Sequence, residues 1–185
     1  MQTRPPSEFQ IYLSRDEIEA RVRTLASEIA ARFDPESTTI VGLMDGAFYF
    51  MADLMRCLDP GFATDFLGLA SYHGKQTSSG HVSVLRPMVG NPAGQTVLLI
   101  DDILDSGLTL DYALEYLRSQ GASSVAAAVL LAKERHRTGR SAAEFVGFYV
   151  PDTFYIGYGL DLGGRYRALA DIYAKNGPDL AVMAS

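Results

Sequence analysis

Hydrophobic and polar residues alternate along this chain with the periods of a mixed α/β protein. A helix is predicted to begin after Ser14, because Ser14-Arg-Asp-Glu17 is a capping box whose serine and glutamate bond free amides of the first turn. The apolar residues that follow recur at helical spacing and form one face: Ile18, Val22, Leu25, Ala26, Ile29 and Phe33. Asp34-Pro35 ends this helix, because the residue before a proline avoids the α region.

Apolar runs separated by turn residues predict the other elements. The segment 96–100 is almost wholly apolar, as expected for a strand buried on both faces of a parallel sheet. The remaining predictions are strands over 38–44, 62–72, 82–85 and 125–132, and helices over 48–58 and 109–119. The polar segment 73–80 is either a mobile loop or, as composition alone favours, the tip of a surface hairpin. Strand, helix and strand with short joins indicate a βαβ crossover and an α/β sheet.

Composition narrows the class of protein. The chain has 185 residues, 48% hydrophobic and 21% charged, so one domain with a sizeable core is expected and global disorder is excluded. A formal charge of -6 argues against a protein whose main task is nucleic-acid binding. A single cysteine, Cys57, excludes a disulfide framework. The longest apolar run, 125–132, is too short to cross a membrane, and residues 1–6 lack a secretory signal, so a cytoplasmic protein is expected.

The most informative segment is 97–110, where a buried strand leads through an acidic turn into a helix. Its polar residues and turn glycine are the first candidate site: Asp101, Asp102, Asp105, Ser106, Gly107 and Thr109. Ligands of open α/β sheets bind beyond the carboxyl ends of strands, and the start of the next helix offers free amides to a phosphate. The paired acids suit ribose hydroxyls or Mg²⁺. The alternative is an acidic loop that merely caps the helix.

This segment resembles the phosphoribosyl-diphosphate (PRPP) binding motif of type I phosphoribosyltransferases, which is two acids, two apolar residues and then Asp-Ser/Thr-Gly-x-Thr. Further segments resemble the hypoxanthine-guanine branch of that family and extend the similarity over roughly residues 11–173. They are 43–54, similar to its pyrophosphate loop and following helix; 70–74 and 78–80, similar to its mobile catalytic loop; and 131–133, 146–161 and 166–167, similar to its purine-binding end.

The resemblance implies the type I phosphoribosyltransferase fold. That fold would be a parallel sheet of about five strands flanked by helices, in a single domain over 1–185 with a core of about 36–150 and a small hood from about 1–14 and 151–185. The implied reaction transfers phosphoribose from PRPP to hypoxanthine, guanine or xanthine with Mg²⁺ as cofactor. PRPP and a 6-oxopurine are the expected partners, without nucleic acid or membrane, in a homodimer or homotetramer.

The resemblance also implies roles for individual residues. Asp105 would be the general base toward purine N7, and Lys133 would donate to the 6-oxo group. PRPP would be bound by Asp101, Asp102, Asp105, Ser106, Gly107, Leu108, Thr109, Asp45, Gly46 and Arg167. The purine would be bound by Lys133, Phe154, Tyr155 and Asp161, with Phe154 stacked on the ring. Ser71 and Tyr72 would belong to the mobile loop, and Asp101, Asp102 and Asp161 would hold the metal.

Two residues depart from the family's pattern. Asp45 precedes Gly46 where a basic residue is usual, and this carboxylate is expected to weaken PRPP binding without abolishing it. Relatives often have a non-proline cis peptide in this loop, which here would be Met44–Asp45. Glu134 follows Lys133 where proline is common, which leaves the purine preference open. The alternatives are a divergent paralogue and an RNA-binding regulator on the same fold, and the net charge of -6 offers the regulator little support.

Overall fold

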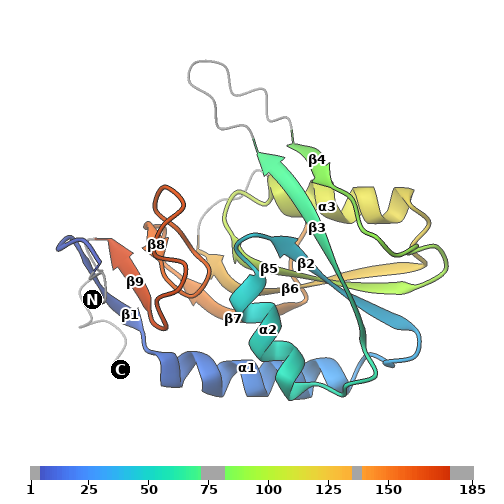
Figure 1. Cartoon of the computed structure of the whole chain (residues 1–185), viewed down its shortest axis with the longest axis horizontal. Coiled ribbons are helices and arrows are strands. Elements are labelled where there is room, and N and C mark those ends of the chain that lie inside the picture. Colours follow the sequence, from blue (N-terminus) through green and yellow to red (C-terminus); the bar gives the residue numbers. More distant parts are fainter. Residues whose placement is uncertain (1–4, 72–81, 135–138, 176–185) are drawn as a thin grey trace.

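The computed structural model describes residues 5–71, 82–134 and 139–175, which form a six-stranded and a three-stranded sheet with flanking helices (Figure 1). In chain order the elements are β1 (Phe9–Leu13), α1 (Arg15–Ala30), β2 (Thr38–Met44), α2 (Phe48–Cys57), β3 (Ala63–Ser71), β4 (Val82–Arg86), β5 (Thr96–Leu104), α3 (Leu108–Ser119), β6 (Ser124–Lys133), β7 (Phe145–Val150), β8 (Tyr155–Ile156) and β9 (Ile172–Lys175). In these ranges no helix has the length and apolar composition needed to cross a bilayer. The predicted loop 73–80 and Tyr72 lie outside the described residues.

The larger sheet has the strand order β4-β3-β2-β5-β6-β7. Its strands β3, β2, β5, β6 and β7 run parallel, as predicted, and β4 is an antiparallel edge strand beside β3. Leu98 and Ile100 of β5 belong to the core on the side of α1 and α2, whereas Val97 and Leu99 pack on the side of α3. This strand is therefore apolar at successive positions because helices cover both of its faces.

Helix α1 begins as the capping box predicts. The Ser14 hydroxyl accepts a bond from the Glu17 amide, and the Glu17 carboxylate accepts one from the Ser14 amide at 2.8 Å. The helix ends at Ala30, so the prediction that Phe33 continues its apolar face is wrong. Phe33 instead follows the helix and packs on Phe145 of β7, with 5.9 Å between the ring centroids.

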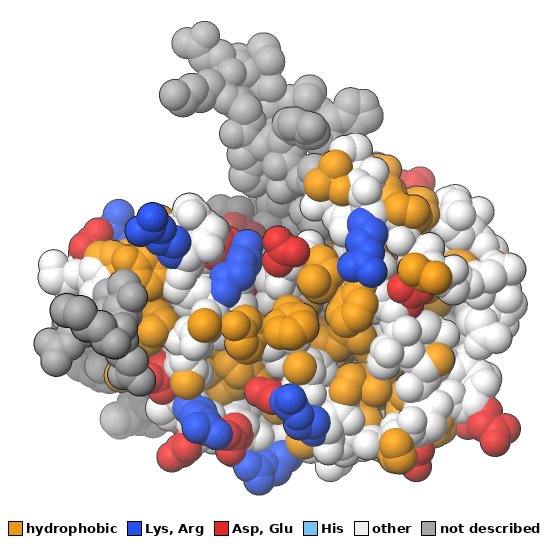
Figure 2. Space-filling view, in the orientation of Figure 1, with side chains coloured by type: hydrophobic (Ala, Val, Ile, Leu, Met, Phe, Trp, Pro, Cys, Tyr) orange, Lys and Arg blue, Asp and Glu red, His pale blue; other side chains and the backbone are white. Residues whose placement is uncertain are grey.

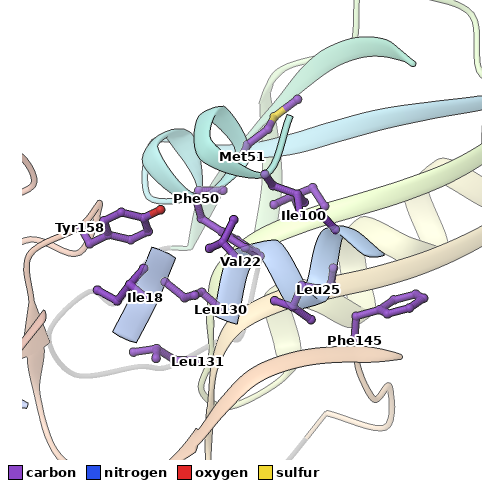
Figure 3. Packing of buried hydrophobic residues seen from close by; sticks show 14 of the residues in the cluster. Ile18, Val22, Leu25, Phe50, Met51, Ile100, Leu130, Leu131, Phe145 and Tyr158 are labelled. Atoms are coloured by element: carbon purple, nitrogen blue, oxygen red, sulfur yellow. The ribbon is translucent and has the colours of Figure 1, made fainter. Parts of the chain in front are cut away.

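The core between α1, α2 and the sheet is built from interleaved aliphatic and aromatic side chains (Figure 3). Ile18, Val22 and Leu25 of α1 lie beside Phe50 of α2 and Leu130 of β6, and all five are at most 2% exposed. Their close packing fixes α2 on the sheet. The loop that precedes α2 is thereby held at the carboxyl end of β2.

Strand β5 is longer than predicted. The sequence placed its end at Ile100, but the strand continues to Leu104 and contains both Asp101 and Asp102. Its pairing with β2 stops at Ile100, whereas its pairing with β6 continues to Leu104 opposite Ala132. The backbone bonds to β6 keep the acidic residues extended, and the two carboxylates lie where β2 and β5 separate.

The smaller sheet forms a hood from the two ends of the chain, as expected, with β1 pairing antiparallel to β9 and β9 to β8. Two side-chain bonds join it to the helices. The Tyr158 hydroxyl donates to Asp53 of α2 at 2.7 Å, and the Asp171 carboxylate accepts the Arg15 amide at the start of α1 at 2.8 Å. The hood is thus held against the middle of α2 and the start of α1.

Candidate nucleotide-type site

The candidate site lies where β2 and β5 are neighbours in the larger sheet. From β2 the chain moves outward to β3 and β4, returns to β5 on the other side of β2, and then moves outward to β6 and β7. The strand order therefore reverses between β2 and β5, and such switch points are where open α/β sheets bind ligands. Asp45 and Gly46 follow β2, and Asp101 and Asp102 follow the part of β5 that pairs with β2.

The predicted pyrophosphate loop and the acidic pair touch each other. A Cβ atom added to Gly46 would overlap the Asp102 carboxylate, so only glycine leaves room for this contact. The Met44–Asp45 peptide is cis, as the resemblance predicted. The side chain of Asp45 is exposed. Two segments that lie far apart in the sequence thus form one continuous surface.

Asp101 and Asp102 are partly buried neighbours of like charge. Burial and the adjacent Asp102 carboxylate raise the pKa of Asp101 well above its ordinary value. Burial also raises the pKa of Asp102, although the Arg167 guanidinium acts in the opposite direction. Asp101 bonds the Asp102 amide at 2.9 Å, and Asp102 bonds the Ile103 amide at 2.8 Å. Desolvated carboxylates of this kind favour a ligand that brings positive charge or hydrogen-bond donors.

The acidic turn ends in a glycine that begins α3. Gly107 is the N-cap residue with φ of 86°, a left-handed conformation that glycine adopts easily. Glycine has no side chain to bond the first amides of the helix. The Ser106 hydroxyl accepts a long hydrogen bond from the Leu108 amide, at 3.4 Å. The start of α3 therefore offers backbone donors and a positive dipole end to an anion.

Lys133 and Asp105 meet although they lie on different segments. Lys133 ends β6 and is 8% exposed, and its Nζ atom lies 3.1 Å from Asp105 Oδ2. The register explains this contact. Leu104 pairs with Ala132, so Asp105, the first residue after β5, comes next to Lys133, the last residue of β6. The same Nζ atom lies 3.2 Å from Asp152 Oδ1. Sequence reasoning missed Asp152, whose only signal was its place in the matching segment 146–161.

Arg167 and Asp161, both predicted site residues, form an ion pair in the turns between β8 and β9. Arg167 Nη2 lies 2.8 Å from Asp161 Oδ1, and Arg167 Nη1 donates to the Gly159 carbonyl at 2.6 Å. The Gly164 amide donates to Asp161 Oδ2 at 2.6 Å. A Cβ atom on Gly159 would overlap the Gly46 carbonyl, so this turn packs directly on the loop after β2.

The predicted purine-binding aromatics differ in exposure. Phe154 is 46% exposed and contacts Phe9 edge to face, with 6.2 Å between centroids. Its exposure fits a stacking role better than the alternative of a core residue. Tyr155 is buried, and its hydroxyl donates to the Pro151 carbonyl at 2.9 Å.

Ser71 is the last residue of β3, which places the start of the predicted mobile loop at this strand end.

The carboxylates at this site fit a magnesium ion whose ligands come partly from the protein and partly from a substrate. Among residues 5–71, 82–134 and 139–175, no three or more His, Cys, Asp or Glu side chains converge as a protein-only metal site would require. Mg²⁺ is commonly held by one or two carboxylates together with substrate oxygens and water. The raised pKa values of Asp101 and Asp102 agree with such a site, because a cation would offset the cost of burying their charge.

The fold and this site define a nucleotide-handling enzyme built on an α/β sheet. Residues 11–162 match the phosphoribosyl transferase domain, and the chain belongs to this family. It is 38% identical over 160 residues to the hypoxanthine-guanine phosphoribosyltransferase of Bacillus subtilis, covering 86% of this chain and 89% of the relative. It is also 38% identical over 166 residues to the enzyme of that name from Aquifex aeolicus, covering 89% of this chain and 93% of the relative.

Solved structures agree with this assignment. A hypoxanthine phosphoribosyltransferase from Staphylococcus aureus superposes with a TM-score of 0.84 at 31% identity, covering 90% of each chain. A hypoxanthine-guanine phosphoribosyltransferase from Bacillus anthracis superposes with a TM-score of 0.83 at 32% identity, covering 89% of this chain and 97% of that chain. The predicted family resemblance and fold are confirmed.

Proposed function

We propose that this protein transfers the 5-phosphoribosyl group of PRPP to a 6-oxopurine in purine salvage, giving a nucleoside 5′-monophosphate and pyrophosphate. The contact between Lys133 and Asp105 carries the proposal, because it places a buried cation and a carboxylate together at neighbouring strand ends beside the start of α3. The similarity to hypoxanthine-guanine phosphoribosyltransferases from two bacteria also supports it.

PRPP would lie across the ends of β2 and β5. The amides and hydroxyls of residues 106–109 would bind its 5′-phosphate at the start of α3. Asp101 and Asp102 would accept bonds from the ribose hydroxyls. The backbone around Gly46 and the guanidinium of Arg167 would hold the pyrophosphate, for which the planar guanidinium provides paired donors. The contact of Gly46 with Asp102 would bring the ribose and pyrophosphate sites together.

The purine would lie between Asp105, Lys133 and Phe154. Asp105 would accept the proton that leaves the purine imidazole ring as another ring nitrogen bonds to the sugar. Lys133 would donate to the 6-oxo oxygen and reject the 6-amino group of adenine, which is itself a donor. Phe154 would stack on the ring, and the backbone of Tyr155 with the carboxylate of Asp161 would complete the site.

We infer that Mg²⁺ binds together with PRPP. Asp101 and Asp102 are the carboxylates that would hold it, directly or through water, and a second ion would require Asp161 to exchange its bond with Arg167. When bound, the ion would neutralise negative charge that develops on the leaving pyrophosphate. The contribution of the chain itself is to orient the two ends of PRPP against the purine.

We further propose that copies of this chain associate through the surface formed by α2 and the neighbouring strands β3 and β4. Figure 2 shows hydrophobic side chains gathered across the middle of the face on which α2 lies. Phe48 is 48% exposed and packs edge-on against Tyr49, and Phe66 of β3 is partly buried beneath Arg86. A surface that combines apolar side chains with arginine is typical of a protein interface.

A steady-state assay with PRPP and Mg²⁺ tests the proposed reaction. Hypoxanthine, guanine, xanthine, adenine and uracil are compared in parallel, with the wild type and with Lys133→Ala. We expect turnover of one or more 6-oxopurines but not of adenine or uracil. Lys133→Ala should lose at least about tenfold in kcat/KM for 6-oxopurines, since bonds from charged groups are the strongest class. Lys175→Ala, which removes an exposed lysine from β9, is the matched control. Absence of turnover with every base would refute the proposal.

A further inference from the structure

A short segment after β6 lies on the acidic turn that begins α3. The Gly139 amide donates to the Ser106 carbonyl at 2.9 Å. The amides of Arg140 and Ser141 donate to the two carboxylate oxygens of Asp111 at 2.8 and 2.7 Å. Three successive backbone amides thus tie residues 139–141 to the first turn of α3 and to the residue before its N-cap.

The contact between this segment and the turn depends on two glycines. A Cβ atom on Gly139 would lie 2.5 Å from the carbonyl carbon of Gly107, 2.6 Å from its oxygen and 2.7 Å from its Cα atom. A Cβ atom on Gly107 would lie 3.1 Å from Gly139 Cα. The neighbouring atoms belong to the backbone, so they cannot give way as the end of a flexible side chain could.

The bond from Gly139 also determines how one amide of the turn is oriented. The peptide unit between Ser106 and Gly107 is trans, since the cis bond of the described chain is Met44–Asp45. In a trans peptide the C=O and N–H bonds point in opposite directions. Because the Ser106 carbonyl faces Gly139, the Gly107 N–H must point away from residues 139–141.

The contacts of Asp111 favour its charged form. Burial acts against its charge, but the bonds from Ser141 and Arg140 outweigh burial and hold the pKa of Asp111 below its ordinary value. Asp111 is also in the first turn of α3, where a negative charge is favoured by the helix dipole. This carboxylate is therefore a stable anchor for the amides of residues 140 and 141.

We propose that Asp111 is a positioning residue for phosphate binding, which acts by holding residues 139–141 against the Ser106–Gly107 peptide. This inference rests on the proposed function, in which the amides of residues 106–109 bind the 5′-phosphate. Without the anchor, the bond from the Gly139 amide to the Ser106 carbonyl is weakened and the peptide unit is held less firmly. The Gly107 amide is then no longer preorganised for the phosphate, and binding must bear the cost of ordering it.

The test measures the contribution of the phosphate separately from that of the rest of the ligand. Binding of ribose 5-phosphate, of a purine nucleoside and of its 5′-monophosphate is measured by calorimetry for the wild type, Asp111→Ala, Asp111→Asn and Gly139→Ala. Glu115→Ala is the matched control, because Glu115 is an exposed carboxylate one turn later on α3. PRPP and purine KM values and kcat are measured for the same proteins, and melting temperatures show that each is folded.

We expect Asp111→Ala and Gly139→Ala to weaken binding of ribose 5-phosphate and the 5′-monophosphate about tenfold, with nucleoside binding and purine KM unchanged. Asp111→Asn, which keeps one acceptor oxygen, should lose less. Equal losses for nucleoside and nucleotide, or losses no larger than those of Glu115→Ala, would overturn the inference. A wild type that does not bind ribose 5-phosphate would also overturn it. A wild type that binds ribose 5-phosphate but turns over no purine would refute the proposed function alone, since the binding comparison still measures the role of Asp111.

Discussion

The acidic end of β5 and the turns of the hood are built in opposite ways, although they meet at Gly46. The acidic region is one continuous strand, turn and helix, in which residues 101–109 follow one another along the chain. The hood region depends on Arg167 reaching back to Gly159 and Asp161, and on a Tyr158 bond to α2. The acidic region is thus set mainly by consecutive residues, whereas the hood also depends on the bond of Tyr158 to Asp53 on a distant helix.

The two regions also differ in their electrostatics. Burial and mutual repulsion raise the pKa of Asp101 at the end of β5. The hood carboxylate Asp161 is neutralised by Arg167 at 2.8 Å and bonded by the Gly164 amide. The acidic region is therefore prepared to receive a cation or hydroxyl donors. In the hood, the ion pair between Arg167 and Asp161 must break before Arg167 can bind an anion with its full charge.

The largest expected effect is on catalysis at the acidic turn. Asp105→Asn should lower kcat by about 10² to 10⁴-fold, because an amide cannot accept the purine proton, while PRPP binding is retained. Asp152→Asn is the matched control, since it removes the other carboxylate beside Lys133. If both variants lost activity equally, the loss would come from disturbing Lys133 and not from removing a base. Steady-state kinetics with PRPP and hypoxanthine or guanine make the measurement.

The next largest effect is on recognition in the hood. Phe154→Ala should raise the purine KM by about fivefold to a hundredfold, because stacking of a base on an aromatic ring contributes about 1–3 kcal/mol. The PRPP KM should change little. Phe154→Tyr keeps the ring and should behave like the wild type. An unchanged purine KM in the alanine variant would mean that base recognition does not depend on this part of the hood.

A smaller effect concerns stability and its dependence on pH. The pKa of Asp101 is higher in the folded chain than its ordinary value of 3.8, so the folded state binds the proton more tightly than the unfolded state. The free energy of unfolding therefore falls as pH rises from that ordinary value through the raised pKa. Asp101→Asn removes the ionisable carboxyl group and with it this decrease in the free energy of unfolding.

Asp101→Asn should thus be more stable than the wild type at neutral pH, by about 1.4 kcal/mol for each unit by which the pKa is raised. The gain should vanish at acid pH, where the wild-type carboxyl is protonated in both states. Urea titrations over this pH range measure the difference, and Glu8→Gln at an exposed position is the control. A destabilised variant at neutral pH would show that the acidic region depends on this charge even without ligand.

The smallest expected effect comes from Asp45, which lies between the two regions. Asp45→Lys should lower the PRPP KM a few-fold by replacing repulsion of pyrophosphate with attraction, and added salt should reduce the gain because Asp45 is exposed. Asp59→Lys makes the same change of charge beyond the other end of α2. A higher KM in Asp45→Lys, or equal gains in both variants, would contradict a local effect.

Much of the fold and of the acidic region could be predicted from the sequence. The capping box of α1, the strand 38–44 and the family resemblance were confirmed, because each depends on residues that are close together in the chain. Gly107 was likewise expected in the turn where it adopts a positive φ. Periodicity, capping and turn chemistry are local properties, and the sequence displays them directly.

Tertiary structure alone decided which of these residues meet. The register of β5 on β6 brings Lys133 to Asp105 and carries β5 beyond its predicted end. The anchoring of residues 139–141 by Asp111 had no signal in the sequence pattern. Strand register and contacts between distant segments follow from how the whole core packs, because many registers satisfy the same local pattern and only one buries the correct faces. The sequence by itself therefore indicated the family and most helices and strands between residues 14 and 132, and packing of the complete chain decided the remaining strands and which residues meet.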